Sequence, residues 1–131
     1  MSQTTGQKRI LVIDDEQDIV FLASERLTSW GYQVLTATSG EEALQMVEQQ
    51  LPDLILLDII MPQMKGREVC ARLRANPKTQ HIPVIFLTAL GMPEHIKAGL
   101  DGGAEDYIVK PFEPTELKGR IEICLARHQN Q

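Results

Sequence analysis

Short apolar runs alternate along this chain with longer segments whose apolar residues recur at helical spacing. The short runs are rich in β-branched residues, which is typical of buried parallel strands. The predicted strands are residues 9–13, 32–36, 54–57, 83–87 and 106–109. The predicted helices are residues 17–30, a segment from 39 that ends before 52, and residues 66–75, 93–101 and 115–127. This alternation predicts an α/β fold with a parallel sheet covered by helices on both faces.

Two local signals mark helix ends. Ser39 and Glu42 form a capping box, in which each side chain can accept a hydrogen bond from a free amide at the start of a helix. Gly31 follows the first predicted helix, where glycine commonly ends a helix. Both signals agree with the boundaries that the periodicity predicts.

Polar side chains gather at the carboxyl ends of the predicted strands. They are Asp14, Asp15 and Glu16 after the first strand, Asp58 after the third, Thr88 after the fourth and Lys110 after the fifth. Because ligands bind beyond this edge in open α/β sheets, we expect these side chains to share one site. Asp53 stands at the start of the third strand, so we expect it at the opposite edge.

The predicted site brings three of these carboxylates close together, those of Asp14, Asp15 and Asp58. One like-charge pair at ~4 Å costs about 4 kcal/mol at an effective dielectric constant of about 20. Mg²⁺ suits a site of carboxylates, waters and a phosphate, so it is the expected cation, with Mn²⁺ as an alternative. Lys110 can neutralise the remaining charge. Because His81, His95 and His128 are scattered and show no ligand spacing with a cysteine, zinc is not expected.

Length and charge narrow the class of protein. The 131 residues fit one domain, predicted at 8–128 between short tails at 1–7 and 129–131. A net charge of −5 argues against non-specific nucleic-acid binding. No membrane-spanning run or signal peptide is evident, so the cytoplasm is the expected location. Cys70 and Cys124 are therefore expected to be buried, reduced thiols.

Four stretches of the chain resemble the receiver domain of two-component response regulators. They are ILVIDDE at 10–16, LLDIIMP at 56–62, FLTA at 86–89 and GAEDYIVKPF at 103–112, and the likeness runs from about residue 8 to 127. The resemblance implies a flavodoxin-like three-layer sandwich, with a five-stranded parallel sheet of order 2-1-3-4-5 and five helices.

The resemblance assigns the acceptor and the metal ligands. Asp58 matches the phosphoacceptor and a metal ligand, Asp15 matches the direct metal ligand, and Asp14 matches the acid that holds metal-bound water. Ile60 matches the position whose backbone carbonyl completes the metal site. Ile60 and Leu90 would also flank the site with bulky apolar groups, and we hypothesise that they slow hydrolysis of the phosphorylated form.

The resemblance also assigns the groups that respond to phosphorylation. Thr88 matches the switch hydroxyl, Lys110 the lysine that pairs with phosphate, and Tyr107 the aromatic residue that moves inward on activation. The bond between Lys110 and Pro111 matches a cis peptide of the family, a state largely restricted to proline.

The implied function is that of a Mg²⁺-dependent switch phosphorylated on Asp58 by a sensor histidine kinase or a histidine phosphotransfer domain. Such a protein is not an enzyme with an external substrate, because it catalyses only its own phosphorylation and dephosphorylation. Its shape change would act on an output partner or domain that the sequence does not identify. A homodimer through 93–101, 106–109 and 115–127 is compatible with the resemblance, although no residue here requires it. No direct nucleic-acid or membrane contact is expected.

Other functions fit parts of the pattern. A phosphatase of the haloacid dehalogenase type also has an Asp after an apolar strand, but it needs a second acid where this chain has Ile60. A nucleotide-binding domain would carry a G-x-G-x-x-G or P-loop motif, and the chain has neither. Taken alone, Asp14, Asp15 and Glu16 could simply cap a helix. A constitutive interaction module with the receiver fold stays as the alternative, although all the acids and the lysine of a switch are present.

Overall fold

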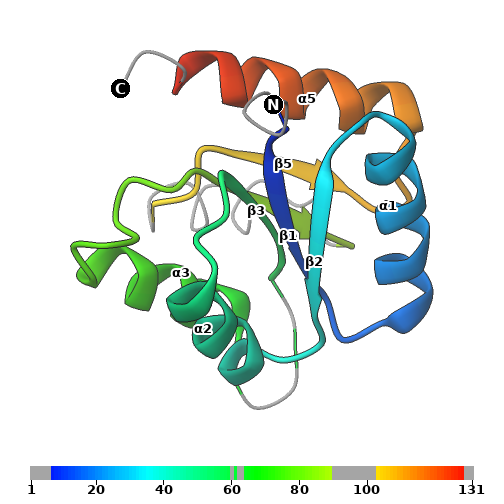
Figure 1. Cartoon of the computed structure of the whole chain (residues 1–131). Coiled ribbons are helices and arrows are strands. Elements are labelled where there is room, and N and C mark those ends of the chain that lie inside the picture. Colours follow the sequence, from blue (N-terminus) through cyan, green and yellow to red (C-terminus); the bar gives the residue numbers. More distant parts are fainter. Residues whose placement is uncertain (1–6, 60, 62–63, 90–102, 129–131) are drawn as a thin grey trace.

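The architecture is a parallel sheet between two layers of helices, as the alternation predicts (Figure 1). The computed structural model describes residues 7–59, 61, 64–89 and 103–128. The strands are β1 (Arg9–Ile13), β2 (Gln33–Ala37), β3 (Leu54–Asp58), β4 (Val84–Thr88) and β5 (Asp106–Val109). All neighbouring pairs are parallel, and the order β2-β1-β3-β4-β5 confirms the predicted topology.

Four helices are present among the described residues. They are α1 (Gln17–Ser29), α2 (Gly40–Gln49), α3 (Gly66–Ala75) and α5 (Pro114–Arg127). The fifth predicted helix, at 93–101, lies outside the described residues. The predicted strand at 83–87 begins one residue later, at Val84. Pro83 has no N–H to donate, but its carbonyl accepts from the Ile55 amide at 3.0 Å, so it lies directly before the strand.

Two separate apolar layers hold the helices to the sheet. Every residue of β3 and β4 is buried, which is why these strands are nearly continuous apolar runs. One layer joins β1 and β3 to α2 and α3 through Ala43, Val47, Val69, Cys70 and Leu73. The other joins the opposite face to α1 and α5 through Val20, Ala23, Leu27, Leu117, Ile121 and Cys124. The sheet is therefore the middle layer of a three-layer sandwich.

Side-chain chemistry at the helix ends follows the sequence signals, with one difference. The Glu42 amide donates to the Ser39 hydroxyl at 3.1 Å, so Ser39 caps α2 as predicted. The Glu42 carboxylate accepts from the amide of Thr38 at 2.8 Å, one residue before the N-cap. Gly31 follows α1 with a φ of +96°, the left-handed conformation that favours glycine.

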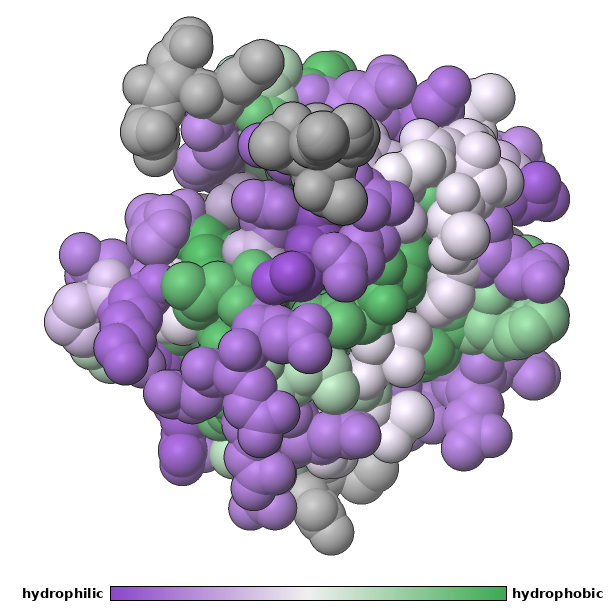
Figure 2. All heavy atoms as spheres, in the orientation of Figure 1, coloured by the Kyte–Doolittle hydropathy of each residue, from purple (hydrophilic) through white to green (hydrophobic). Residues whose placement is uncertain are grey.

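The outer surface is mostly hydrophilic where it faces the β2 edge of the sheet. Hydrophobic side chains show there only in patches between hydrophilic ones (Figure 2). Gln33 and Thr36 of β2 are exposed, so the edge strand presents polar side chains to solvent. Among the described residues, no helix is long and apolar enough to cross a membrane.

The strand register brings the ends of the central strands to one level. Ile13 of β1 pairs with Leu57 of β3, Asp58 pairs with Leu87 of β4, and Thr88 pairs with Val109 of β5. The residues that follow these pairs therefore meet at the carboxyl edge of the sheet. This edge carries the candidate site.

Candidate functional site

Three carboxylates converge at the carboxyl edge, as predicted. One oxygen from each of Asp14, Asp15 and Asp58 lies within 4.8 Å of the others. Asp14 is fully buried and Asp58 is 4% exposed, whereas Asp15 is exposed. Two buried acids beside a third one need a compensating positive charge. An all-oxygen donor set with one solvent-facing member fits a hard divalent cation such as Mg²⁺.

Lys110 supplies positive charge within the protein. Its Nζ donates to Asp14 Oδ2 at 3.0 Å and lies 3.6 Å from Asp58 Oδ1. The lysine side chain is only 8% exposed. Burial disfavours its charge, but the hydrogen bonds to Glu16 and Asp14 and the charge of Asp58 outweigh that cost and raise the pKa of Lys110. The ammonium is therefore held charged between the acids.

Glu16 is a member of the site that the sequence analysis placed at the strand end but gave no role. Its Oε1 accepts from Lys110 Nζ at 2.9 Å, and its side chain is 62% exposed. Its backbone amide donates to Asp14 Oδ1 at 2.9 Å. Glu16 therefore competes with Asp58 for Lys110 and orients Asp14. The acidic run at 14–16 was the sequence signal, but it could not show which acid would turn toward the lysine.

Gly66 is a second residue whose contribution the sequence did not reveal. A Cβ at this position would lie 2.1 Å from the backbone oxygen of Asp58 and 2.9 Å from Cα of Ile59. The Gly66 amide donates to the carbonyl of Ile59 at 2.8 Å. The start of α3 thus packs directly on the backbone of Asp58, and only glycine allows that approach.

Thr88 and Lys110 are joined through the backbone. The Lys110 amide donates to the Thr88 carbonyl at 2.7 Å, and Thr88 is 1% exposed. The Lys110–Pro111 peptide is cis, which confirms the prediction for this bond. Ala89 follows Thr88 and is exposed, so a small residue stands at the open side of the site.

Tyr107 lies on β5 and is half-buried. Its ring packs against the core layer beside α2 and α3, and the Arg120 guanidinium carbon lies 5.5 Å from its centroid. Arg120 is held in turn by Asp106 at 2.6 Å and by Glu116 at 3.2 Å. The inward movement of Tyr107 stays a prediction. Ile60 and Leu90 lie outside the described residues, so their predicted roles do too.

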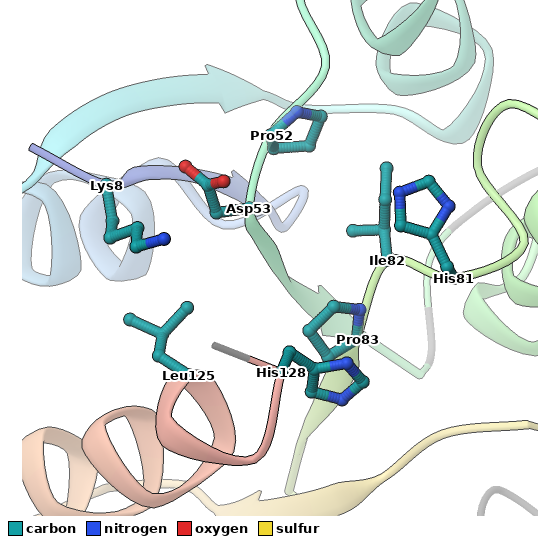
Figure 3. Close-up of a pocket in the computed structure, with 8 residues that line it drawn as sticks. All are labelled: Lys8, Pro52, Asp53, His81, Ile82, Pro83, Leu125 and His128. Atoms are coloured by element: carbon teal, nitrogen blue, oxygen red, sulfur yellow. The ribbon is translucent and has the colours of Figure 1, made fainter. Parts of the chain in front are cut away.

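Asp53 lies at the amino edge, far from the acidic cluster, as predicted. Its Oδ2 accepts from the Arg9 amide at 2.8 Å. Asp53 lines a cavity of about 250 Å³ together with Lys8, His81 and His128. Figure 3 shows these side chains around it. The opposite ends of β3 thus carry two different polar environments.

One expectation about the cysteines and histidines was wrong. Cys70 and Cys124 are both buried, as predicted. However, Cys124 and His128 are four residues apart, one helical turn at the end of α5, and Glu105 approaches both. The expectation that no histidine has ligand spacing with a cysteine therefore does not hold for Cys124 and His128. Helical spacing alone brings those two side chains to one face.

Comparisons with known proteins agree with this geometry. Residues 10–122 match the family model of the response regulator receiver domain. The chain is 47% identical, over 125 residues, to the probable transcriptional regulator ycf27 of Cyanophora paradoxa, covering 95% of this chain and 51% of that protein. The chain therefore spans about half the length of the curated relative it matches.

Solved structures share the whole architecture. A putative response regulator from Chloroflexus aurantiacus superposes with a TM-score of 0.88 at 39% identity, covering 92% of this chain and 98% of that chain. The receiver domain of a sensor histidine kinase from Pseudomonas aeruginosa superposes with a TM-score of 0.85 at 28% identity, covering 92% and 99%. The latter structure has a magnesium ion coordinated in its active-site cleft.

Proposed function

This chain belongs to the family of response regulator receiver domains, and from that premise we propose that it is a switch that accepts a phosphoryl group on Asp58. The observation that carries the proposal is the position of Asp58 at the end of β3, beside two further acids and 3.6 Å from Lys110. The donor is a phosphohistidine of a sensor histidine kinase or of a phosphotransfer protein. The protein has no external turnover substrate in this proposal.

The chemical step begins with a carboxylate oxygen of Asp58 as the nucleophile. A bond forms between that oxygen and phosphorus, and the bond between phosphorus and the donor imidazole nitrogen breaks. The electron pair of the broken bond stays on the imidazole. Later attack by water releases inorganic phosphate and restores the carboxylate.

The carboxylates of Asp14, Asp15 and Asp58 would hold Mg²⁺, together with the backbone carbonyl at position 60. When bound, Mg²⁺ would offset negative charge on the phosphoryl oxygens. Lys110 supplies a second positive charge from within the protein, already desolvated and positioned by Asp14. The buried, preorganised donor needs little rearrangement to contact a phosphoryl group on Asp58.

The signal starts from the new oxygens on Asp58. They are strong acceptors for Lys110 and for the Thr88 hydroxyl. Because the Thr88 carbonyl already binds the Lys110 amide, a movement at either residue reaches the other. Thr88 would move toward the phosphoryl group and leave space for Tyr107. The face formed by β5 and α5 would then repack and change its affinity for an output partner, with a coupling of about 1–3 kcal/mol.

The test is phosphorylation followed by intact mass. With acetyl phosphate and Mg²⁺, we expect one phosphoryl adduct on the wild type and on Asp53→Asn, which changes an acid at the opposite edge. We expect no adduct on Asp58→Asn. An adduct that persists in Asp58→Asn would overturn Asp58 as the acceptor. A wild type that accepts phosphate neither from acetyl phosphate nor from a phosphohistidine donor would favour the constitutive interaction module.

A further inference from the structure

Glu105, Cys124 and His128 form a second cluster of potential metal ligands at the edge of the sheet opposite Asp58. One donor atom from each lies within 4.8 Å of the others. The Cys124 Sγ lies 3.5 Å from Glu105 Oε2, and His128 Nε2 contacts Glu105 Oε1. The cluster thus joins the residue before β5 to the last turn of α5.

The backbone fixes the three positions before any ligand binds. The Glu105 amide donates to the Val84 carbonyl at 2.8 Å, which anchors Glu105 beside the first residue of β4. Cys124 points into the apolar layer under α5 and is 2% exposed. His128 is the C-cap of α5, and its amide donates to the Leu125 carbonyl at 3.2 Å. The backbone thus holds the three residues in positions where their donor atoms already lie within 4.8 Å of one another.

The donor set has the chemistry of a zinc site. Thiolate sulfur, imidazole nitrogen and carboxylate oxygen are the usual protein ligands of Zn²⁺, and three of them leave one position for water. Mg²⁺ prefers oxygen ligands, so this cluster and the acidic cluster at Asp58 select different ions. The side chains of Glu105 and His128 are 27% and 22% exposed, which gives an ion access from solvent.

One charged residue beside the cluster, Arg127, would compete with a metal ion for Glu105. Arg127 Nη1 lies 3.6 Å from Glu105 Oε2, but the arginine side chain is 62% exposed. Such exposed ion pairs contribute little, so Arg127 can be displaced. Burial and the neighbouring Glu105 raise the pKa of Cys124 to about 12, so the thiol is protonated at neutral pH. A bound ion therefore has to replace that proton, and binding releases it to solvent.

We propose that Glu105, Cys124 and His128 are the protein ligands of a Zn²⁺ site that is separate from the phosphorylation site. The simpler interpretation is that hydrogen bonds among these side chains hold the end of α5 against the start of β5, with no metal bound. The two interpretations differ in one measurable respect, because only the first places a thiolate on a metal.

The test uses Co²⁺ as a spectroscopic probe on the full chain, with excess Mg²⁺ present to occupy the acidic cluster. We expect a thiolate-to-cobalt charge-transfer absorption that Zn²⁺ displaces at one equivalent. The acidic cluster contains no sulfur, so it cannot produce this absorption. The absorption is expected to disappear in Cys124→Ser and to persist in Cys70→Ser, which changes the other buried cysteine.

The same titration measures how much His128 and Glu105 contribute to the affinity for Zn²⁺. We expect His128→Gln and Glu105→Gln to weaken Zn²⁺ binding at least about tenfold, because even the loss of a residue that only hydrogen-bonds to a metal ligand has an effect of that size. His81→Gln changes an exposed histidine outside the cluster and is expected to bind as the wild type does. Because His128 lies at the C-terminal end of α5 with a partly exposed side chain, its substitution tests the site without opening the core, and circular dichroism checks folding.

Three results would overturn the proposal. The first is the absence of a sulfur-to-cobalt absorption in the folded wild type. The second is an absorption that Cys70→Ser removes and Cys124→Ser retains. The third is Zn²⁺ binding that is unchanged in both His128→Gln and Glu105→Gln.

Discussion

The Lys110 ammonium lies 3.6 Å from a carboxylate oxygen of Asp58, yet it is closer to Glu16, at 2.9 Å, and to Asp14, at 3.0 Å. In this arrangement the lysine is shared among three acids, and its hydrogen bonds go to Glu16 and Asp14 rather than to Asp58. A phosphoryl group on Asp58 would add charge and draw Lys110 away from Glu16. The exposed Glu16 can then release the lysine at little cost.

Removal of the lysine should slow phosphorylation more than it affects folding. We expect Lys110→Ala to reduce the rate of phosphorylation by acetyl phosphate about a hundredfold, the effect of losing one preorganised charge donor. The rate is measured by intact mass at saturating Mg²⁺. Lys118→Ala changes an exposed lysine on α5 and should leave the rate unchanged. Equal rates for Lys110→Ala and the wild type would show that Lys110 does not act on the reaction.

Mg²⁺ should stabilise the folded protein. At a concentration about 100 times its Kd, an ion that binds only the folded state adds about 2.7 kcal/mol to the free energy of unfolding. Urea unfolding with Mg²⁺ and with a chelator measures this difference. We expect Asp15→Asn to lose most of it and Asp53→Asn to retain it, because only Asp15 belongs to the acidic cluster. An equal gain in both variants would place the ion elsewhere.

Gly66 should tolerate no side chain. Because an added Cβ would lie 2.1 Å from the Asp58 carbonyl oxygen, we expect Gly66→Ala to lower the free energy of unfolding by about 3 kcal/mol, as overpacking does. The displaced backbone should also slow phosphorylation of Asp58.

The matched control is Gly119→Ala in α5, where an added Cβ meets no atom within 4 Å apart from its chain neighbours and the nearby backbone of the helix itself. Alanine in a helix interior is expected to stabilise the protein there by up to about 1 kcal/mol. Urea unfolding of both variants gives the comparison. A Gly66→Ala protein as stable as the wild type would mean that α3 can move away from Asp58 without cost.

The thiol of Cys124 should make the protein less stable at high pH. Its pKa is raised from 9.0 to about 12 by burial and by Glu105, so the folded state keeps a proton that the unfolded state loses above pH 9. Between pH 9 and 12, this group therefore lowers the free energy of unfolding by about 1.4 kcal/mol per pH unit. Urea unfolding from pH 8 to 10.5 measures the slope.

Cys124→Ala should reduce that slope by this amount. Lys110 and Cys70 also have raised pKa values, so part of the alkaline slope is expected to persist in the variant. Parallel slopes for the wild type and Cys124→Ala would contradict a raised pKa at Cys124.

The sequence pattern by itself determined that the sheet is parallel and which of its edges carries the site, whereas the strand order followed from the resemblance to receiver domains. Buried parallel strands have to be apolar throughout, so β3 and β4 stand out as apolar runs ended by Asp58 and Thr88. Strand polarity then separated Asp58 from Asp53, because side chains that follow parallel strands share an edge. These features depend only on local pattern and on the direction of the chain.

Tertiary structure decided the contacts between elements that pack against each other. Whether Lys110 lies closer to Glu16 or to Asp58 depends on the side-chain conformations in the folded site. The spacing of these residues along the sequence does not determine those conformations. The approach of Gly66 to the Asp58 backbone depends on how closely α3 packs against the sheet. The spacing of Cys124 and His128 could be read along α5, but Glu105 reaches them only because β5 lies under that helix. Pattern places residues on an element and an edge, whereas packing decides which side chains touch.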